Sequence, residues 1–252
     1  MGGVGTYSDE AVVLRTHKLG EADRIVTMLT RQHGKVRAVA KGVRRTSSRF
    51  GARLEPFSHV DLQLVEGRSL DIVSQAVTRH LFGQPFLSDY AAYTAAEAMV
   101  ETADQLVAQE KVPALPHYLL LLGALRTLGV GTPDGRRPAA MVLDAYLLRA
   151  LATAGYAPVL DGCAGCGRPG GHDFFSPSAG GLVCAECRPP GSAVIGPAAL
   201  AYLVALLTGR WEDTRDVAPA VQGEGSGLVA AFATWQLERG LRSLRHVERG
   251  PA

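Results

Sequence analysis

Four cysteines are the residues of this sequence whose type and spacing most directly predict chemistry. Cys163 and Cys166 form one C-x2-C pair, and Cys184 and Cys187 form a second pair after seventeen intervening residues. Two residues between cysteines let one tight turn aim both sulfurs at one point, and two such turns supply the four thiolates that tetrahedral zinc accepts. The spacing therefore predicts one Zn²⁺ ion bound by all four cysteines.

A shell of four thiolates leaves zinc no open position for a water molecule, so we interpret this site as structural rather than catalytic. A thioredoxin-like redox function is less favoured, because two pairs at this spacing indicate a metal. A zinc deaminase is disfavoured because its ligand-x-Glu element precedes its cysteine pair, whereas here Cys184-Ala-Glu186 follows one. His172 lies between the two pairs and is interpreted as a loop residue, since four sulfurs complete the shell.

Positive charge is concentrated in the first third of the chain. Residues 1–80 contain 13 Lys and Arg against 8 Asp and Glu, whereas residues 81–252 contain 13 against 16. Residues 31–53 contain eight basic residues and no acidic one. Such a run is often only a solvated face, but basic residues also contact the phosphates of nucleic acids. The candidate contacts are Arg15, Lys18, Arg24, Lys35, Arg37, Lys41, Arg44, Arg45, Arg49 and Arg53.

The elements that must position these cations are predicted to be short strands. Alternating and β-branched residues predict strands at 10–16, 24–30, 35–41, 58–65 and 70–77. Five short strands predict a small closed barrel, and five is the strand number of the OB-fold, although an SH3-like barrel would fit nearly as well. Lys35 and Arg37 should then emerge from one outer face, and residues 41–49 should form a loop of cations and hydroxyls.

The barrel region offers few aromatic platforms on which bases could stack. Its aromatic residues are Tyr7, Phe50, Phe57 and Phe82, and Phe57 could equally belong to the core. We therefore expect phosphate contacts to outweigh base stacking, and binding to weaken steeply with salt. No helix resembles an element that reads base sequence, so sequence specificity is not expected.

Beyond residue 83 the pattern changes to helical periodicity. Helices are predicted at 88–109, 117–128, 139–154, 197–208 and 228–245, with loops at 132–138 and 212–227. Residues 118–125 are apolar nearly all round, which indicates a core helix or, as the alternative, a groove for a partner peptide. The expected fold is a five-stranded OB-fold barrel over residues 1–82, followed by an all-helical domain over residues 83–252 with a four-cysteine zinc knuckle inserted at 160–190.

The sequence gives no indication of catalysis. It has no phosphate-binding glycine loop and no two-histidine zinc motif, and the acidic pairs at 9–10 and 21–23 are interpreted as surface ion pairs with the nearby Arg15 and Arg24. It also has no stretch of eighteen apolar residues and no apolar signal segment, so a cytoplasmic protein is expected. Two classes remain, a DNA-binding accessory protein and an RNA-binding OB-fold protein with a zinc ribbon.

Several segments resemble the RecO family of bacterial DNA repair proteins. Residues 10–27 (EAVVLRTHKLGEADRIVT) resemble the opening of that family, and residues 34–45 (GKVRAVAKGVRR) and 54–57 (LEPF) follow in the same order. The later cysteine pairs and the helical half agree with the family layout. The resemblance covers about residues 7–247.

This resemblance implies an N-terminal OB-fold and a helical domain that often carries a zinc knuckle. It implies a protein that is not an enzyme, binds single- and double-stranded DNA and anneals complementary strands. It further implies action with RecR, and in many bacteria RecF, to help RecA displace the single-strand binding protein SSB, whose acidic and apolar C-terminal tail the helical domain would dock. By this similarity the ten basic residues become DNA-contact candidates, zinc becomes a scaffold, and the protein is expected at the nucleoid.

Overall fold

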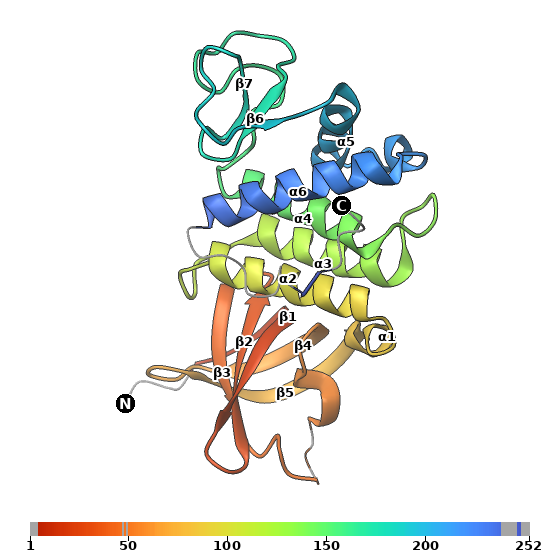
Figure 1. Cartoon of the computed structure of the whole chain (residues 1–252). Helices are drawn as coiled ribbons and strands as arrows, with labels where there is room; N and C mark the ends of the chain where they lie inside the picture. Colours follow the sequence, from red (N-terminus) through yellow and green to blue (C-terminus); the bar gives the residue numbers. More distant parts are fainter. Residues whose placement is uncertain (1–4, 47, 49, 238–245, 248–252) are drawn as a thin grey trace.

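The N-terminal strands form a small five-stranded barrel (Figure 1). The computed structural model describes residues 5–46, 48, 50–237 and 246–247. The strands are β1 (Thr6–Leu19), β2 (Asp23–Thr30), β3 (Gly34–Ala40), β4 (Ser58–Val65) and β5 (Asp71–Leu81). They pair in the order β1-β2-β3-β5-β4, and β4 returns to pair with β1. The shortest strand pairing in the barrel is between β3 and β5, where only Ala38 and Val39 of β3 have partners. This short pairing suits the partly open barrel of an OB-fold.

Alternation along the strands fills the barrel interior. Val36, Ala38 and Ala40 of β3 point inward, where they meet Leu62 and Leu64 of β4 in one buried cluster. The opposite face of β1 is also buried, because Val12 and Leu14 pack into the core of the helical domain. Side chains of one strand therefore serve two cores, and the barrel is joined to the helices by apolar contact as well as by the chain.

In the described part of the chain six α-helices follow the barrel, and in Figure 1 they stack in layers on one end of it. They are α1 (Gly83–Phe86), α2 (Tyr90–Leu106), α3 (Leu115–Val130), α4 (Ala139–Thr153), α5 (Pro197–Thr208) and α6 (Pro219–Gln236). The carboxylate of Asp89 caps α2 by accepting the N–H of Ala92 at 2.9 Å. Helix α4 is the central one, since it contacts α2, α3, α5 and α6 and is buried from Met141 to Leu148.

The predicted loop at 212–227 is wrong. A short 3-10 helix, η2 (Trp211–Thr214), comes first, and α6 begins at Pro219, a favoured first residue of a helix. One of the glycines that suggested a loop serves packing instead, because a Cβ at Gly225 would lie 2.6 Å from Cδ1 of Tyr202 on α5. The prediction of helix at 238–245 concerns residues outside those that the structure describes.

Helix α3 is core on one face only. Tyr118, Leu121, Leu125 and Leu128 are buried, whereas Leu119 is 51 % exposed. The core interpretation is confirmed for the buried face, and the partner groove stays a prediction for the exposed one. Pro116 also lies inside the first turn of α3, where a missing N–H costs nothing, rather than breaking the helix.

The chain between α4 and α5 forms the cysteine knuckle, which in Figure 1 projects beyond the helices on the side away from the barrel. Its small sheet contains β6 (Phe174–Ser176), β7 (Gly181–Val183) and β8 (Ala193–Val194). Phe175 and Leu182 anchor this sheet in the helical core, and the ring of Phe175 lies 6.0 Å from that of Phe232 on α6.

The predicted fold class is confirmed, and no helix in the described part of the chain is long and apolar enough to cross a membrane.

Candidate metal centre and nucleic-acid interface

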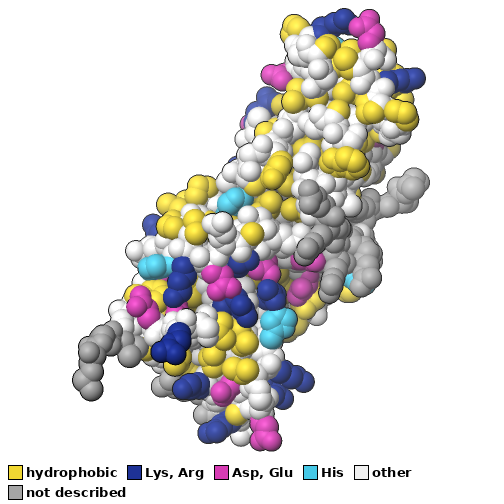
Figure 2. All heavy atoms as spheres, turned by 90° about the vertical axis from the view of Figure 1, so that its left-hand side faces the viewer, with side chains coloured by type: hydrophobic (Ala, Val, Ile, Leu, Met, Phe, Trp, Pro, Cys, Tyr) yellow, Lys and Arg dark blue, Asp and Glu magenta, His cyan; other side chains and the backbone are white. Residues whose placement is uncertain are grey.

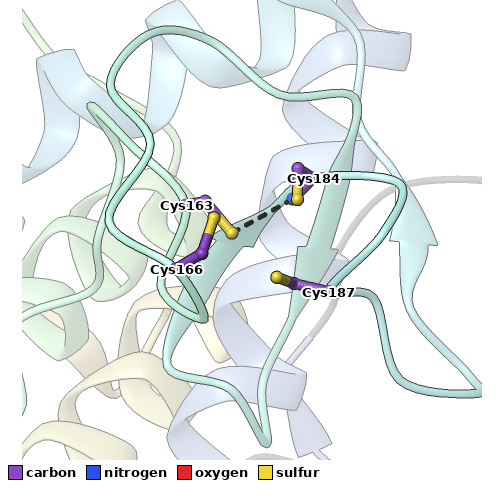
Figure 3. Close-up of side chains that lie close together, drawn as sticks. All are labelled: Cys163, Cys166, Cys184 and Cys187. Carbon is purple, nitrogen blue, oxygen red and sulfur yellow. Dashed lines mark hydrogen bonds between the residues drawn. The ribbon is translucent and has the colours of Figure 1, made fainter.

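The knuckle brings the four cysteine sulfurs to one point (Figure 3). The Sγ atoms of Cys163, Cys166, Cys184 and Cys187 all lie within 4.8 Å of one another. Each pair sits on a tight turn, in which the N–H of Gly167 donates to the carbonyl of Cys163 at 2.8 Å and the N–H of Cys187 to that of Cys184 at 3.2 Å. The arrangement that the spacing predicts is therefore present, and it could hold a metal ion.

The thiols of this cluster differ in their affinity for protons. The N–H of Cys184 donates to Sγ of Cys163 at 3.3 Å, and this bond lowers the pKa of the Cys163 thiol to about 6. Side-chain hydrogen bonds with Cys184 and Cys166 raise the pKa of Cys187 to about 12. Four sulfurs this close cannot all ionise without a cation between them, so the donor set fits a divalent ion that displaces the thiol protons. His172 contacts the carbonyl of Arg168 and is not part of the sulfur cluster.

Five of the predicted cations meet at the end of the barrel away from the helices, which is the lower end in Figure 1. Lys18 pairs with Arg24 across β1 and β2, and Arg24 pairs with Ala40, the residue before Lys41. The N–H of Arg44 binds the carbonyl of Ala22 at 3.0 Å, which draws the loop after β3 onto the β1–β2 turn. We call this surface the basic tip, and its members are Lys18, Arg24, Lys41, Arg44 and Arg45.

Most of the charge of the basic tip is not neutralised by the residues that the structure describes. Arg24 forms an ion pair with Glu55 at 2.6 Å, and Arg44 donates to the carbonyls of Gly20 and Glu21 at 3.2 and 2.8 Å. Among the described residues, no ion pair involves the other three members, Lys18, Lys41 and Arg45. Figure 2 shows Lys and Arg side chains gathered on the barrel half of the molecule.

The other strand cations are held by carboxylates of the helical domain. Arg15 and Lys35 both bind Asp104 of α2, with N–O distances of 2.7 and 3.1 Å. Arg37 binds Glu110 at 3.3 Å. Lys35 and Arg37 do lie on the outer face, as the alternation predicts, but Lys35 is only 8 % exposed. The structure therefore separates these three residues from the basic tip.

Of the two remaining candidates, the structure describes Arg53 alone. Arg53 belongs to the short helix η1 (Gly51–Leu54) and borders a shallow hollow of about 410 Å³ beside Ser74 and Ala76 of β5. Arg49 falls outside the described residues. Arg79 was missed by the sequence analysis because β5 continues to Leu81, beyond the predicted strand end, and Arg79 binds Asp61 at 2.6 Å.

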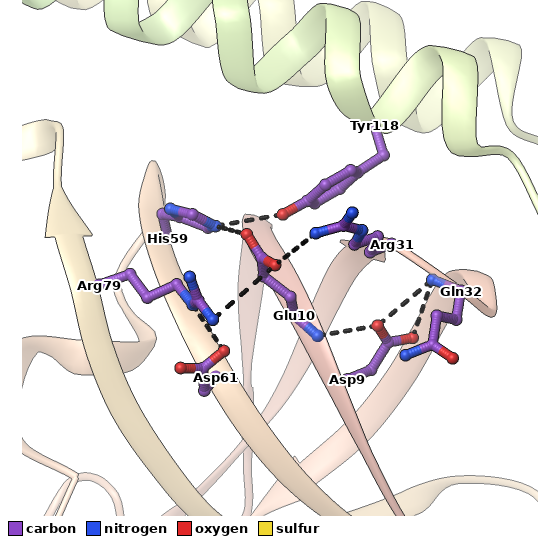
Figure 4. Close-up of polar contacts among 8 residues, drawn as sticks. All are labelled: Asp9, Glu10, Arg31, Gln32, His59, Asp61, Arg79 and Tyr118. Atoms are coloured by element: carbon purple, nitrogen blue, oxygen red, sulfur yellow. Dashed lines mark hydrogen bonds and ion pairs between the residues drawn. The ribbon is translucent and has the colours of Figure 1, made fainter.

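The acidic residues at 9–10 are not surface partners of Arg15, and this prediction is wrong. Asp9 is buried and accepts the N–H groups of Gln32 and His33 at 3.1 and 3.2 Å. Glu10 binds Nε2 of His59 at 2.7 Å (Figure 4). The pair at 21–23 was assigned to Arg24, which binds Glu55 instead. Asp9 thus holds the turn between β2 and β3, and Glu10 links β1 to β4. The strand pairing directs these two carboxylates toward partners other than Arg15.

Burial and hydrogen bonding oppose each other at Glu10. Burial alone would raise the pKa of Glu10, but hydrogen bonds from Tyr118, His59 and Arg31 outweigh it and hold the pKa below its ordinary value. Burial lowers the pKa of His59, which keeps this imidazole neutral beside the hydroxyl of Tyr118 at 3.1 Å. Since Glu10 lies on β1, His59 on β4 and Tyr118 on α3, this network ties the barrel to the helices.

Comparison with known proteins decides the family. Residues 3–82 match the model described as "Recombination protein O N terminal", and residues 87–245 match "Recombination protein O C terminal". The chain belongs to the RecO family. It is 60 % identical over 244 residues to the "DNA repair protein RecO" of Cutibacterium acnes, with 97 % of this chain and 99 % of that protein covered.

Other RecO proteins are similarly close. The "DNA repair protein RecO" of Thermobifida fusca is 59 % identical, with 96 % of this chain and 98 % of that protein covered. The protein of the same name from Streptomyces coelicolor is 55 % identical, with 96 % and 99 % covered. The resemblance seen in the sequence is thereby confirmed along both the barrel and the helical domain, and the chain is assigned to DNA repair and recombination.

Proposed function

We propose that this chain is a recombination mediator that binds single- and double-stranded DNA and anneals complementary strands. With RecR, and with RecF where that protein is present, it helps RecA load onto single-stranded DNA coated with SSB. The observation that carries the DNA-binding part is the basic tip on the OB-fold of a RecO family chain. In this scheme residues 1–82 bind DNA, residues 83–252 bind protein partners, and the protein acts at the nucleoid in the cytoplasm.

The basic tip suits binding to phosphates without regard to base sequence. Lys18, Lys41 and Arg45 keep their charge for a ligand, and neutralising phosphates releases counterions. The aromatic residues of the barrel favour this mode, because Phe50, Phe57 and Phe82 are buried. The hydroxyl of Tyr7 donates to Asp71 at 2.6 Å, so base stacking contributes little. Annealing of this kind needs no catalytic group, since a cationic surface holds two strands and screens their repulsion.

The ion of the metal centre is one structural Zn²⁺, bound by Cys163, Cys166, Cys184 and Cys187. The donor set supports this choice, because four sulfurs within 4.8 Å of one another match the closed tetrahedral shell of structural zinc. Zinc would supply no reaction there. The bound cysteines hold the knuckle sheet in place, and Phe175 and Leu182 of that sheet cover the helical core.

The acidic, apolar tail of SSB docks in the groove between α3 and α4. This groove has a volume of about 480 Å³. Its lining combines apolar side chains with one cation, which suits a peptide that is both apolar and acidic. Its apolar lining includes Leu119, Leu120, Ala124, Tyr146 and Trp211, and Arg149 lies at its rim. Because Leu119 is 51 % exposed, the apolar face of α3 that the core does not use is available to such a peptide.

The test of the proposed function is the annealing of two complementary oligonucleotides, naked or coated with the cognate SSB. The proposal predicts that the protein accelerates both reactions at low salt and that high salt abolishes the effect. Acceleration on naked strands alone would remove the SSB partnership. Failure on both, together with preferential binding of RNA, would favour the RNA-binding class instead.

The SSB groove is tested by titrating a fluorescent peptide of the SSB tail. Arg149→Glu should weaken binding at least about tenfold, because it replaces attraction with repulsion of the acidic tail. Arg126→Glu is the matched control, since Arg126 is exposed on α3 and is not among the residues that line the groove. Equal loss in both variants would show a general charge effect and would contradict this docking site.

A further inference from the structure

The chain between α2 and α3 runs along the outside of the barrel, and we call residues 107–114 the strap. Lys35 and Glu110 form a parallel bridge, and the N–H of Lys111 donates to the carbonyl of Lys35 at 2.8 Å. This pairing occurs on the part of β3 that β5 does not reach, because β5 pairs only with Ala38 and Val39. The strap therefore fills the seam that the barrel leaves open.

The strap is held close to the barrel by specific contacts. A Cβ at Gly34 would lie only 1.8 Å from the carbonyl oxygen of Val112, so glycine is required for this approach. Lys111 adopts a positive φ of 59°, and its Nζ donates to the buried carboxylate of Asp71 at 2.9 Å. The covered position is thus a defined state of the molecule and not an incidental path of a loop.

Two carboxylates at this crossing bind three cations of the barrel. The carboxylate of Asp104, near the end of α2, accepts from Nε of Arg15 at 2.7 Å and from Nζ of Lys35 at 3.1 Å. Glu110, within the strap, accepts from Arg37 at 3.3 Å. These are the groups that a nucleic-acid backbone would otherwise supply, because phosphates accept hydrogen bonds from Arg and Lys as carboxylates do.

The covered face is also the one that OB-folds use for ligands, since oligonucleotides bind over strands 2 and 3. We propose that Arg15, Lys35 and Arg37 form a second site for the backbone of single-stranded DNA, and that the end of α2 and the strap together cover this site, with Asp104 of α2 and Glu110 of the strap in place of phosphates. This inference rests on the proposed function, and it adds a site distinct from the basic tip. The phosphates of DNA and these two carboxylates compete for the same three cations.

The contacts differ in how easily DNA displaces them. The Arg37–Glu110 pair is about two-fifths exposed on each side, and exposed pairs of this kind are weak. Lys35 and Asp104 are largely covered, with side-chain exposures of 10 % and 18 %. Displacement therefore begins at Glu110, and release of Lys35 follows once a phosphate can replace the Asp104 carboxylate.

The test compares the full-length protein with the double variant Asp104→Asn/Glu110→Gln in binding to a fluorescent oligothymidylate at several salt concentrations. The variant frees three cations, so binding should tighten at low salt. The slope of log affinity against log salt should steepen by about 2, since each single-strand phosphate contact contributes about 0.7. The control Glu212→Gln/Asp216→Asn removes the same charge from exposed residues far from the barrel and should change neither quantity.

Affinity and slope equal to those of the unmodified protein, or an equal change in the control, would overturn the covered site. In that case, binding lost in Lys41→Ala/Arg44→Ala/Arg45→Ala would leave the proposed function standing on the basic tip. Absence of binding by every form, at any salt, would instead contradict the proposed function itself, and the second site with it.

A second measurement avoids any loss of stability caused by the substitutions. Hydrogen exchange of the Lys111 amide in the unmodified protein reports the strap directly, because this N–H binds the carbonyl of Lys35. Added oligothymidylate should accelerate that exchange several-fold while the amides inside β2 stay protected. Unchanged or slower exchange at saturating DNA would show that the strap stays in place, and the inference would be wrong.

Discussion

The hydroxyl of Tyr118 on α3 lies 3.1 Å from Nε2 of His59 on β4, so one contact spans the boundary between the helices and the barrel. The same imidazole nitrogen lies 2.7 Å from the carboxylate of Glu10 on β1 (Figure 4). All three side chains are largely buried. A buried polar network of this kind fixes the relative position of the elements that contribute to it.

Tyr118→Phe should lower the free energy of unfolding by about 1.5–3 kcal/mol, because the largely buried carboxylate of Glu10 then loses the Tyr118 hydroxyl as one of its hydrogen-bond donors. Urea unfolding followed by circular dichroism measures this loss. Tyr156→Phe is the control, since Tyr156 is 49 % exposed and its change should stay within about 0.5 kcal/mol. Equal losses in the two variants would show that the hydroxyl of Tyr118 has no structural role.

Acid should destabilise the protein in two stages. Hydrogen bonds hold the pKa values of Glu10 and Asp71 below their ordinary values of 4.5 and 3.8, although burial opposes both shifts. Their contribution to stability is present above those ordinary values and is lost as the pH falls through the lowered ones. Burial lowers the pKa of His59 from its ordinary 6.5, so the unfolded chain takes up that proton first and stability begins to fall below about pH 6.5.

The pH dependence is measured as the free energy of unfolding from neutral to acid solution. Glu10→Gln should flatten the part of the curve below pH 4.5, since that side chain no longer titrates. Greatest stability near pH 4, or a Glu10→Gln curve that parallels the unmodified one, would contradict these assignments.

The metal centre should bind about one equivalent of zinc per chain by elemental analysis. Cys184→Ser should lose the metal and lower the melting temperature, because Phe175 and Leu182 join the knuckle to the helical core. His172→Ala should keep the metal, since His172 lies between the cysteine pairs but outside the sulfur cluster. A folded, metal-free protein of equal stability would contradict a structural role for zinc.

Local patterns predicted the barrel and the cysteine cluster correctly. Alternation identified Lys35 and Arg37 as outward-facing residues of β3, because the direction of a strand side chain depends only on its position along the strand. Cysteine spacing identified the four-sulfur cluster for a similar reason, since one turn sets the direction of two sulfurs. The glycines of α6 misled the prediction because the packing of Gly225 against Tyr202 of α5 is not visible in local sequence.

The partners of the strand cations could not be predicted in this way. Asp104 is 89 residues from Arg15 and 69 residues from Lys35 in sequence. Periodicity shows that a side chain points outward, but it does not show which other element covers that face. The cations of the basic tip differ from Arg15, Lys35 and Arg37 only in their tertiary contacts. Local sequence does not contain those contacts, which explains why it grouped all ten cations together.

The central claim is that the basic tip binds the DNA backbone, and the most direct measurement is the salt dependence of binding to a fluorescent single-stranded oligonucleotide. The unmodified protein is compared with Lys41→Ala/Arg44→Ala/Arg45→Ala and with the control Arg126→Ala/Arg210→Ala/Arg215→Ala, which removes equal charge from the helical domain. If the basic tip binds the DNA backbone, the tip variant binds more weakly and its salt slope is shallower by about 2, at about 0.7 per lost contact, whereas the control keeps both values. Affinity and slope unchanged in the tip variant would show that DNA binds elsewhere on the protein.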